Sequence, residues 1–125
     1  MDNKRALVIM VDDDITNLTV AKNNLSSTFD FFSAPSGEKL FTLLEKVTPA
    51  IILLDVEIPE MNGFEIIKVL KSSEKTSNIP VIFLTGSIDP ERESEGMSLG
   101  AVDYLTKPFS RELLIKRIET HISKK

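Results

Sequence analysis

Residues 51–55 read Ile51-Ile52-Leu53-Leu54-Asp55, four apolar residues in a row followed at once by a carboxylate. The run does not alternate with polar residues, so it suits a strand that is covered on both faces, as in a parallel sheet. Two further runs share this character, Leu7-Val8-Ile9-Met10-Val11 and Val81-Ile82-Phe83-Leu84. Three such runs predict a parallel sheet with helices packed on both of its faces.

Between these runs, apolar residues recur three or four positions apart, which predicts amphipathic helices. The sets are Leu18, Ala21 and Leu25; Leu40, Leu44 and Val47; Phe64, Ile67 and Leu70; and Leu114, Ile118 and Ile122. Two weaker strands are expected near 30–34 and 101–106. The alternation predicts right-handed crossovers and an α/β fold with a doubly wound, five-stranded parallel sheet and five helices. Residues 1–125 are expected to form a single domain.

Two segments near the end of the chain carry polar features. Asp89 to Leu99 has few apolar anchors and an interior Gly96, which costs a helix about 1 kcal/mol relative to Ala. Two interpretations of this weak helix stay open, a solvated surface helix and a movable element. His121 is expected to be solvated at the negative end of the last helix dipole.

The composition excludes several classes of function. A net charge of −4 and a pI of about 5.0 argue against direct binding of nucleic acid, which needs a clustered basic face. The chain has no cysteine, so disulfide and thiolate chemistry are excluded. No apolar run approaches the roughly 18 residues that a membrane helix needs, and the N-terminus lacks a signal peptide pattern. We expect a cytoplasmic protein that does not enter the membrane.

Polar side chains follow the predicted strands at the point where each strand ends. Asp12-Asp13-Asp14 follows the first strand and Asp55 ends the third. Thr85 ends the fourth strand, and Lys107 follows the fifth. Because the carboxyl ends of parallel strands share one edge, and ligands bind in the crevice beyond it, we expect these side chains to converge there.

The converging residue types indicate phosphoryl transfer. Several close carboxylates repel one another and need a cation, and hard oxygen ligands suit Mg²⁺. The metal and Lys107 would neutralise phosphoryl oxygens, while Thr85 would donate a hydrogen bond. Asp55 can be the nucleophile that forms an aspartyl phosphate. Asp14 is expected to cap the following helix and to lie outside the metal shell.

Four stretches of the chain closely resemble the receiver (phosphoacceptor) domain of two-component response regulators. They are Val11-Asp12-Asp13-Asp14, Leu54-Asp55-Val56-Glu57-Ile58-Pro59-Glu60-Met61-Asn62-Gly63, Phe83-Leu84-Thr85-Gly86, and Gly100-Ala101-Val102-Asp103-Tyr104-Leu105-Thr106-Lys107-Pro108-Phe109. The resemblance covers nearly the whole chain. It implies the flavodoxin-like strand order 2-1-3-4-5.

The resemblance implies a set of residues around a metal ion, Mg²⁺ or Mn²⁺. Asp55 matches the phosphorylated aspartate and also a metal ligand. Asp13 matches the direct ligand of the acidic pair, and Asp12 its partner that acts through water. The main-chain carbonyl of Glu57 matches the third protein ligand. Glu57 and Ser87 flank the approach to Asp55 and are expected to influence the attacking water.

The resemblance also implies residues that hold and sense the phosphoryl group. Thr85 and Lys107 match the hydroxyl and the lysine that bind it, and Gly86 matches a small residue that leaves room beside the backbone. Tyr104 matches an aromatic switch residue, which is expected to turn inward as Thr85 moves toward the phosphoryl group. The Lys107–Pro108 peptide is expected to be cis.

The implied function is a switch rather than an enzyme, with self-catalysed phosphorylation and dephosphorylation. A histidine kinase or phosphotransfer protein would phosphorylate Asp55. The altered face of the fourth helix, fifth strand and fifth helix would then engage a downstream effector domain or protein, or a second copy of the chain. Two alternatives stay open. One is a phosphatase with an aspartyl nucleophile and Glu57 as general acid, and the other is a phosphorylation-independent scaffold with a receiver fold.

Overall fold

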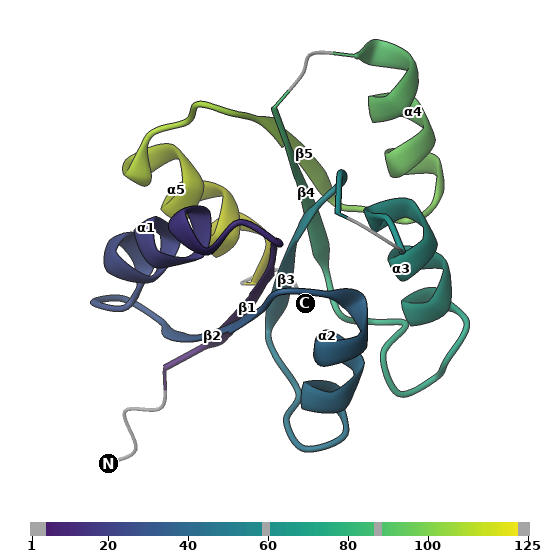
Figure 1. Cartoon of the computed structure of the whole chain (residues 1–125), viewed down its shortest axis with the longest axis horizontal. Coiled ribbons are helices and arrows are strands. Elements are labelled where there is room, and N and C mark those ends of the chain that lie inside the picture. The colour runs from purple at the N-terminus through teal and green to yellow at the C-terminus, as the bar shows by residue number, and fades with distance from the viewer. Residues whose placement is uncertain (1–4, 59–60, 87–88, 123–125) are drawn as a thin grey trace.

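Five parallel strands form the centre of the molecule, and the computed structural model describes residues 5–58, 61–86 and 89–122 (Figure 1). The strands lie in the order β2-β1-β3-β4-β5. They are β1 (Leu7–Val11), β2 (Asp30–Ala34), β3 (Ile51–Asp55), β4 (Val81–Thr85) and β5 (Asp103–Thr106). Every neighbouring pair is parallel, so the predicted sheet and its strand order are confirmed.

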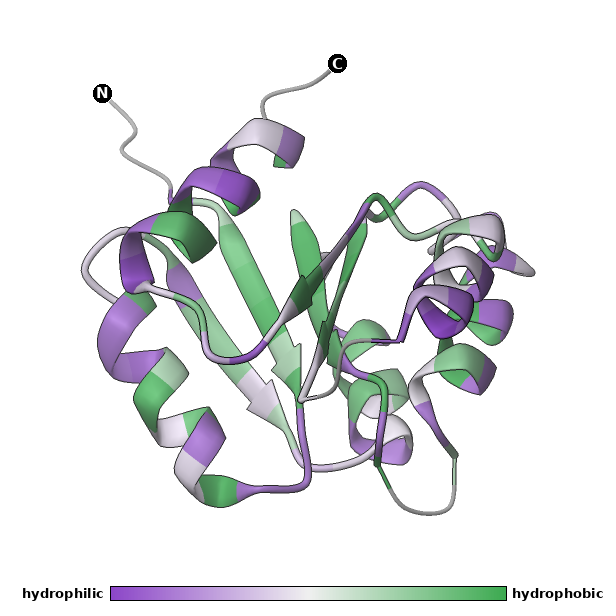
Figure 2. Cartoon of the chain, turned by 90° about the horizontal axis from the view of Figure 1, so that it is seen from above, coloured by the Kyte–Doolittle hydropathy of each residue, from purple (hydrophilic) through white to green (hydrophobic). Residues whose placement is uncertain are grey.

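Helices cover both faces of this sheet (Figures 1 and 2). The described residues form α1 (Ile15–Leu25), α2 (Gly37–Leu44), α3 (Gly63–Lys71), α4 (Pro90–Ser98) and α5 (Arg111–Ile122). Helices α1 and α5 lie on one face, and α2, α3 and α4 lie on the other. The doubly wound arrangement follows from the right-handed crossovers of alternating strands and helices.

Side chains of the three central strands alternate between the two helical layers. Those that face α2 and α3 are Ile9, Val11, Ile52, Leu54, Val81 and Phe83. Those that face α1 and α5 are Val8, Met10, Ile51, Leu53, Ile82 and Leu84. Burying one such side chain stabilises the fold by about 1.5–3 kcal/mol. Both sets are buried, which explains why these strands read as continuous apolar runs.

Polar side chains fix where the helices begin. Asp14 accepts hydrogen bonds from the Thr16 and Asn17 N–H groups, which confirms its predicted role as the N-cap of α1. The sequence analysis missed a reciprocal cap on α3. There the Asn62 side chain accepts from the Glu65 N–H, and the Glu65 carboxylate accepts from the Asn62 N–H. The Asn-x-x-Glu spacing was a readable signal for this cap.

Helix α4 makes a close approach to the sheet through a glycine. Within α4, all of whose residues are described, Gly96 is the one that is buried. A Cβ at this position would lie 3.0 Å from Phe83 and 3.3 Å from Phe64. The expectation of few buried anchors is confirmed, but Gly96 has a packing role that the sequence did not reveal.

Strand β5 begins at Asp103 rather than near 101. Gly100 adopts a left-handed conformation with φ 115°, and the Ala101 N–H still donates to the Gly96 carbonyl at the end of α4. The chain therefore completes the helix end before it enters the sheet.

The prediction that His121 is solvated is wrong. Its Nε2 lies 3.1 Å from Asp103 Oδ2, and its side chain is 13% exposed. Arg117 Nη1 donates to both oxygens of the same carboxylate, at 2.8 and 2.7 Å. Burial raises the pKa of Asp103, but hydrogen bonds from Arg117, the Tyr104 N–H and His121 outweigh it and hold the pKa below its ordinary value. Strand β5 brings Asp103 to the last turn of α5, a contact that a separation of 18 residues hides in the sequence.

Among the helices of the described ranges, none has the length and apolar character required to cross a bilayer.

Candidate functional site

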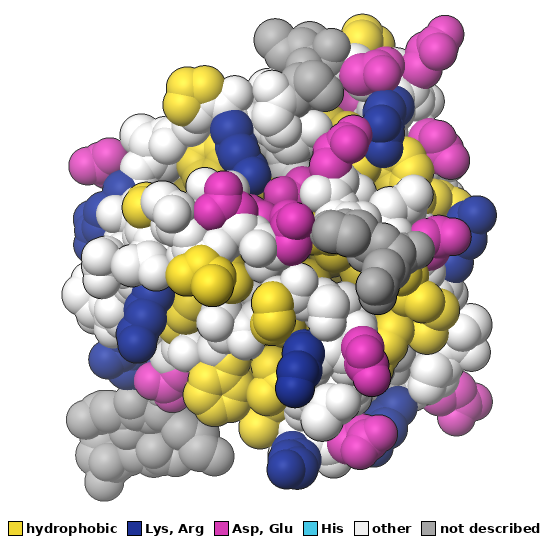
Figure 3. All heavy atoms as spheres, in the orientation of Figure 1, with side chains coloured by type: hydrophobic (Ala, Val, Ile, Leu, Met, Phe, Trp, Pro, Cys, Tyr) yellow, Lys and Arg dark blue, Asp and Glu magenta, His cyan; other side chains and the backbone are white. Residues whose placement is uncertain are grey.

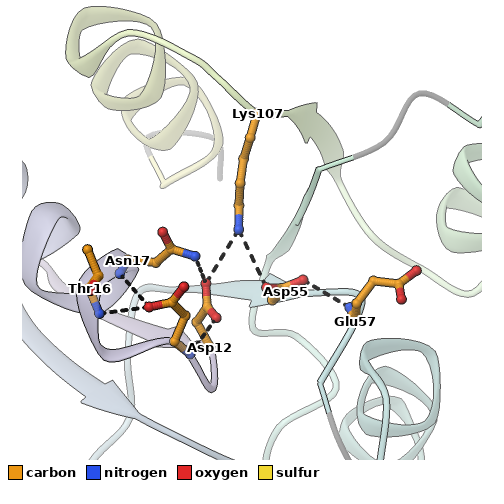
Figure 4. A network of polar contacts seen from close by, with 7 residues as sticks. Asp12, Thr16, Asn17, Asp55, Glu57 and Lys107 are labelled. Atoms are coloured by element: carbon orange, nitrogen blue, oxygen red, sulfur yellow. Dashed lines mark hydrogen bonds and ion pairs between the residues drawn. The ribbon is translucent and has the colours of Figure 1, made fainter.

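The predicted polar residues meet at the carboxyl edge of the sheet (Figure 4). Asp12 follows β1, Asp55 ends β3, and Lys107 follows β5. Lys107 Nζ lies 3.4 Å from Asp12 Oδ2 and 3.5 Å from Asp55 Oδ2. In the space-filling view, acidic side chains gather near the centre of this face, over the strand ends (Figure 3). The predicted convergence is therefore confirmed for these three side chains.

The two acids after β1 differ in environment. Asp12 is 1% exposed, and both of its oxygens accept hydrogen bonds. Its Oδ1 accepts from the Asp14 N–H at 2.9 Å, and its Oδ2 accepts from Asn17 Nδ2 at 3.1 Å as well as from Lys107. Asp13, by contrast, is exposed. This difference fits a direct ligand at Asp13 and an indirect, water-mediated role for Asp12.

Three carboxylates lie close enough to share a metal ion. Asp12, Asp13 and Asp55 each offer an oxygen, and these oxygens lie within 4.8 Å of one another. The donors are hard oxygens at a partly open edge, a set that suits Mg²⁺ and leaves room for water ligands. Asp14, which caps α1, is not part of this group among the described residues. These three residues form an acidic pocket that fits a divalent cation.

Asp55 is a buried carboxylate with a hydrogen-bond donor and charged groups of both signs around it. It is 7% exposed, and its Oδ1 accepts from the Glu57 N–H at 2.9 Å. Burial raises the pKa of Asp55, the Glu57 N–H and the Lys107 charge lower it, and Asp12 raises it, with a net rise. A cation in the acidic pocket would therefore favour the ionised, nucleophilic form of Asp55.

The predicted switch pair is in contact. Thr85 is 2% exposed at the end of β4. Its side chain shares a hydrogen bond with that of Tyr104, whose half-buried ring packs edge-on against Phe83 with centroids 6.0 Å apart. Burial raises the pKa of Tyr104, while the positive charge of Arg92 and the Thr85 hydrogen bond oppose that rise. The Tyr104 ring thus lies against the strand that carries Thr85.

The remaining predicted residues have mixed outcomes. Among the described residues, a Cβ added at Gly86 would have no neighbour within 4 Å, so no described side chain crowds the backbone beside Thr85. The Lys107–Pro108 peptide is cis, as the resemblance implied. Ser87 lies outside the described residues.

Two contacts at this site were missed by the sequence analysis. Asn17 donates to Asp12 from the first turn of α1, and its place three residues after the acidic run was a weak signal. Arg92 Nη1 donates to Glu57 Oε2 at 2.8 Å, across 35 positions of sequence. Nothing in the sequence pairs these two residues.

Comparisons with known proteins agree with this geometry. The family model described as "Response regulator receiver domain" matches residues 8–119. The chain is 39% identical over 124 residues to a Vibrio cholerae protein named "Probable cyclic di-GMP phosphodiesterase", covering 99% of this chain and 28% of that protein. It is 30% identical over 125 residues to the "DNA-binding response regulator MtrA" of Mycobacterium bovis, covering 98% of this chain and 53% of that protein. The structure of the Vibrio cholerae chemotaxis protein CheY4 superposes with a TM-score of 0.88 and 30% identity, over 94% of this chain and 98% of that one.

Proposed function

This chain belongs to the response regulator receiver domain family of two-component signalling, and we propose that Asp55 is its phosphoryl acceptor. One observation carries the proposal. The buried Asp55 carboxylate lies at the carboxyl edge of the sheet, beside the Lys107 ammonium and two further carboxylates. A nucleophile, a fixed cation and a metal-binding pocket are the parts that an aspartyl phosphate site needs.

The residues of the chain would divide the chemistry as follows. Asp13, Asp55 and the main-chain carbonyl of Glu57 would hold Mg²⁺ or Mn²⁺, with Asp12 acting through water. The ion supplies charge neutralisation for the phosphoryl oxygens when it is bound. An Asp55 oxygen forms the new bond to phosphorus as the bond from phosphorus to the donor nitrogen breaks. Lys107 pairs with a phosphoryl oxygen and Thr85 donates to another.

The same site would return the switch to its resting state. Water attacks the acyl phosphate, releasing inorganic phosphate and the free Asp55 carboxylate. Gly86 would leave the approach open, and Glu57 would influence the attacking water. The same role is proposed for Ser87, which lies outside the described residues. The chain is thus a regulator that undergoes self-catalysed phosphorylation and dephosphorylation, rather than an enzyme with a separate substrate.

Receiver domains work with histidine kinases and effector domains. The donor would be a histidine kinase or phosphotransfer protein in the cytoplasm. The two curated relatives carry names of different outputs, and the chain spans 28% and 53% of their lengths. We therefore expect the output to lie in an effector domain or a separate protein. The face formed by α4, β5 and α5 would contact that effector or a second copy of the chain.

The phosphatase alternative requires Glu57 to act as a general acid. Its carboxylate is instead paired with Arg92 at 2.8 Å. The Glu57 side chain also points away from Asp55, so it is not placed to donate a proton to a group leaving from that residue (Figure 4). The pairing and this orientation therefore disfavour the phosphatase mechanism.

Phosphoryl transfer can be tested without the cognate kinase. Incubation with Mg²⁺ and acetyl phosphate should add one phosphoryl group per chain, measured by intact mass. Asp55→Asn removes the nucleophile and EDTA removes the metal, so either change should abolish labelling. Labelling that survives one of them would contradict the proposed site.

Metal binding has a matched pair of variants. Mg²⁺ at 100 times its Kd should stabilise the wild type by about 2.7 kcal/mol, measured by thermal unfolding. Asp13→Asn should remove most of this stabilisation. Asp14→Asn makes the same charge change one residue away and keeps a competent N-cap, so it should retain the response. Equal responses of the two variants would argue against Asp13 as a direct ligand.

A further inference from the structure

Arg92 joins helix α4 to two other parts of the molecule. Its Nη1 donates to Glu57 Oε2 at 2.8 Å, in the segment that follows β3. Its guanidinium carbon lies 5.4 Å from the centre of the Phe64 ring on α3, a cation–π distance. One side chain of α4 therefore contacts both the loop after Asp55 and the neighbouring helix.

Glu57 connects that contact to the acceptor carboxylate. Its N–H donates to Asp55 Oδ1 at 2.9 Å, while its side chain points away from Asp55 (Figure 4). The backbone of Glu57 thus holds the acceptor, and its carboxylate is held by Arg92. A change in the surroundings of Asp55 that displaces Glu57 must alter the Arg92 contact as well.

Helix α4 has few other attachments to the fold. Of its described residues, only Gly96 is buried, against Phe83 and Phe64. Arg92 lies four positions before Gly96, about one helical turn away on the same face. The position of α4 is therefore set by a close approach at one turn and by the Arg92 contacts at the preceding turn.

We propose that Arg92 is a positioning residue that couples occupancy of the Asp55 site to the position of α4 through Glu57. This route runs through the loop after β3, whereas the contact between Thr85 and Tyr104 runs through β4 and β5. The charge of Arg92 also acts on Tyr104, so the Glu57 side of the pair is the one that distinguishes the two routes. The inference rests on the proposed function, since the coupled ligand is the phosphoryl group on Asp55. Coupling of this kind is reciprocal, so loosening α4 alters binding at Asp55 by the same factor.

Hydrogen exchange measures this coupling directly. Amide exchange in α4 is compared with and without Mg²⁺ and beryllofluoride, a phosphoryl mimic, in wild type, Arg92→Gln, Glu57→Gln and the double variant. We expect the mimic to change α4 exchange in the wild type, and each single variant to reduce that change at least twofold. The double variant should resemble the single variants, because both remove the same interaction. Reversal of the pair by Glu57→Arg with Arg92→Glu should restore the response.

Glu57→Gln is the decisive variant, because it lies outside α4 and a purely local effect on the helix would leave its α4 response intact. Glu95→Gln, an exposed charge change within α4, is the control and should respond as the wild type does. The inference is overturned if Glu57→Gln responds like the wild type, if the effects of the two single variants add, or if α4 of the wild type does not respond to bound mimic. A wild type that binds no mimic and takes no label at Asp55 would instead overturn the proposed function.

Discussion

Helices α3 and α4 have nine residues each and lie on the same face of the sheet, yet they are held in different ways (Figure 1). Helix α3 begins with a full capping box and buries Gly63, Phe64, Ile66, Ile67 and Leu70. Helix α4 buries Gly96 alone among its described residues and places Glu91, Glu93 and Glu95 in solvent.

The packing therefore fixes α3 in place, whereas displacing α4 costs little free energy. Side chains such as Ile66 and Ile67 each contribute about 1.5–3 kcal/mol of burial, so displacing α3 would disrupt the core. A glycine contributes no side-chain burial, and a partly exposed ion pair such as Arg92 with Glu57 contributes about 0–1 kcal/mol. Of the two interpretations of the weak helix, the contacts favour the movable element.

The largest expected effect tests this contrast in stability. Ile67→Ala should lower the free energy of unfolding by about 2–5 kcal/mol, because it leaves a cavity under α3. Met97→Ala, at a position on α4 that is 41% exposed, should change it by about 0.5 kcal/mol or less. Urea unfolding of both variants provides the measurement. Comparable losses would mean that α4 is as firmly packed as α3.

Two carboxylates also differ, because their surroundings shift their pKa values in opposite directions. Asp103 is bound by Arg117, His121 and a backbone N–H, and its pKa is lowered. Asp55 is buried near a second carboxylate, and its pKa is raised. Asp103 therefore stabilises the fold when it is ionised, whereas ionised Asp55 destabilises the fold unless a metal ion is bound.

The second prediction concerns Asp103. Hydrogen bonds to a charged group contribute about 1.5–3 kcal/mol, so Asp103→Asn should lose roughly this much stability at pH 7. A lowered pKa gives stability that is present above the unfolded-state pKa and lost as pH falls through the folded-state pKa. The difference between wild type and variant should therefore shrink in strong acid, measured by urea unfolding across pH. A difference that stays constant with pH would mean that the charge of Asp103 does not matter.

The third prediction concerns Asp55, where we expect a smaller change that raises the free energy of unfolding instead of lowering it. In metal-free buffer Asp55→Asn should be more stable than the wild type at pH 7, because it removes a buried negative charge. A raised pKa gives stability that is present below the unfolded-state pKa and lost as pH rises through the folded-state pKa. The advantage of the variant should thus vanish in acid and should also narrow when Mg²⁺ is added to the wild type. A variant less stable than the wild type at pH 7 would show that Asp55 is already well compensated by Lys107.

The smallest expected effect concerns the close approach of α4. In a solvated helix, Gly96→Ala would raise the free energy of unfolding by about 1 kcal/mol. Here the new Cβ would lie 3.0 Å from the buried Phe83 ring, and overpacking costs about 1–3 kcal/mol. We expect the gain to be cancelled, with a net loss of about 1 kcal/mol or less in urea unfolding. The full gain of about 1 kcal/mol would contradict tight packing at Gly96.

These features differ in how far the sequence could reveal them. The strands and the convergence of Asp12, Asp55 and Lys107 followed from apolar runs and from the rule that parallel strands share a carboxyl edge. Local signals also predicted the cap at Asp14. Side-chain contacts between different helices, strands and loops could not be predicted, because no local pattern pairs Arg92 with Glu57 or His121 with Asp103.

Gly96 shows that a residue's role can also be misjudged from its sequence context alone. In the sequence it reads as a weakness of the helix, since propensity is a local property. In the structure it is the point where α4 meets Phe83 and Phe64. Whether a glycine weakens a helix or allows a contact depends on what lies opposite, which only the fold decides.

The most direct test of the central claim locates the phosphoryl group in the chain. After labelling with acetyl phosphate and Mg²⁺, borohydride reduction converts an aspartyl phosphate to homoserine, which tandem mass spectrometry assigns to a position. We predict homoserine at position 55 and at no other acidic residue. Homoserine at position 12 or 13, or none at position 55 in a chain that carries the label, would contradict the account.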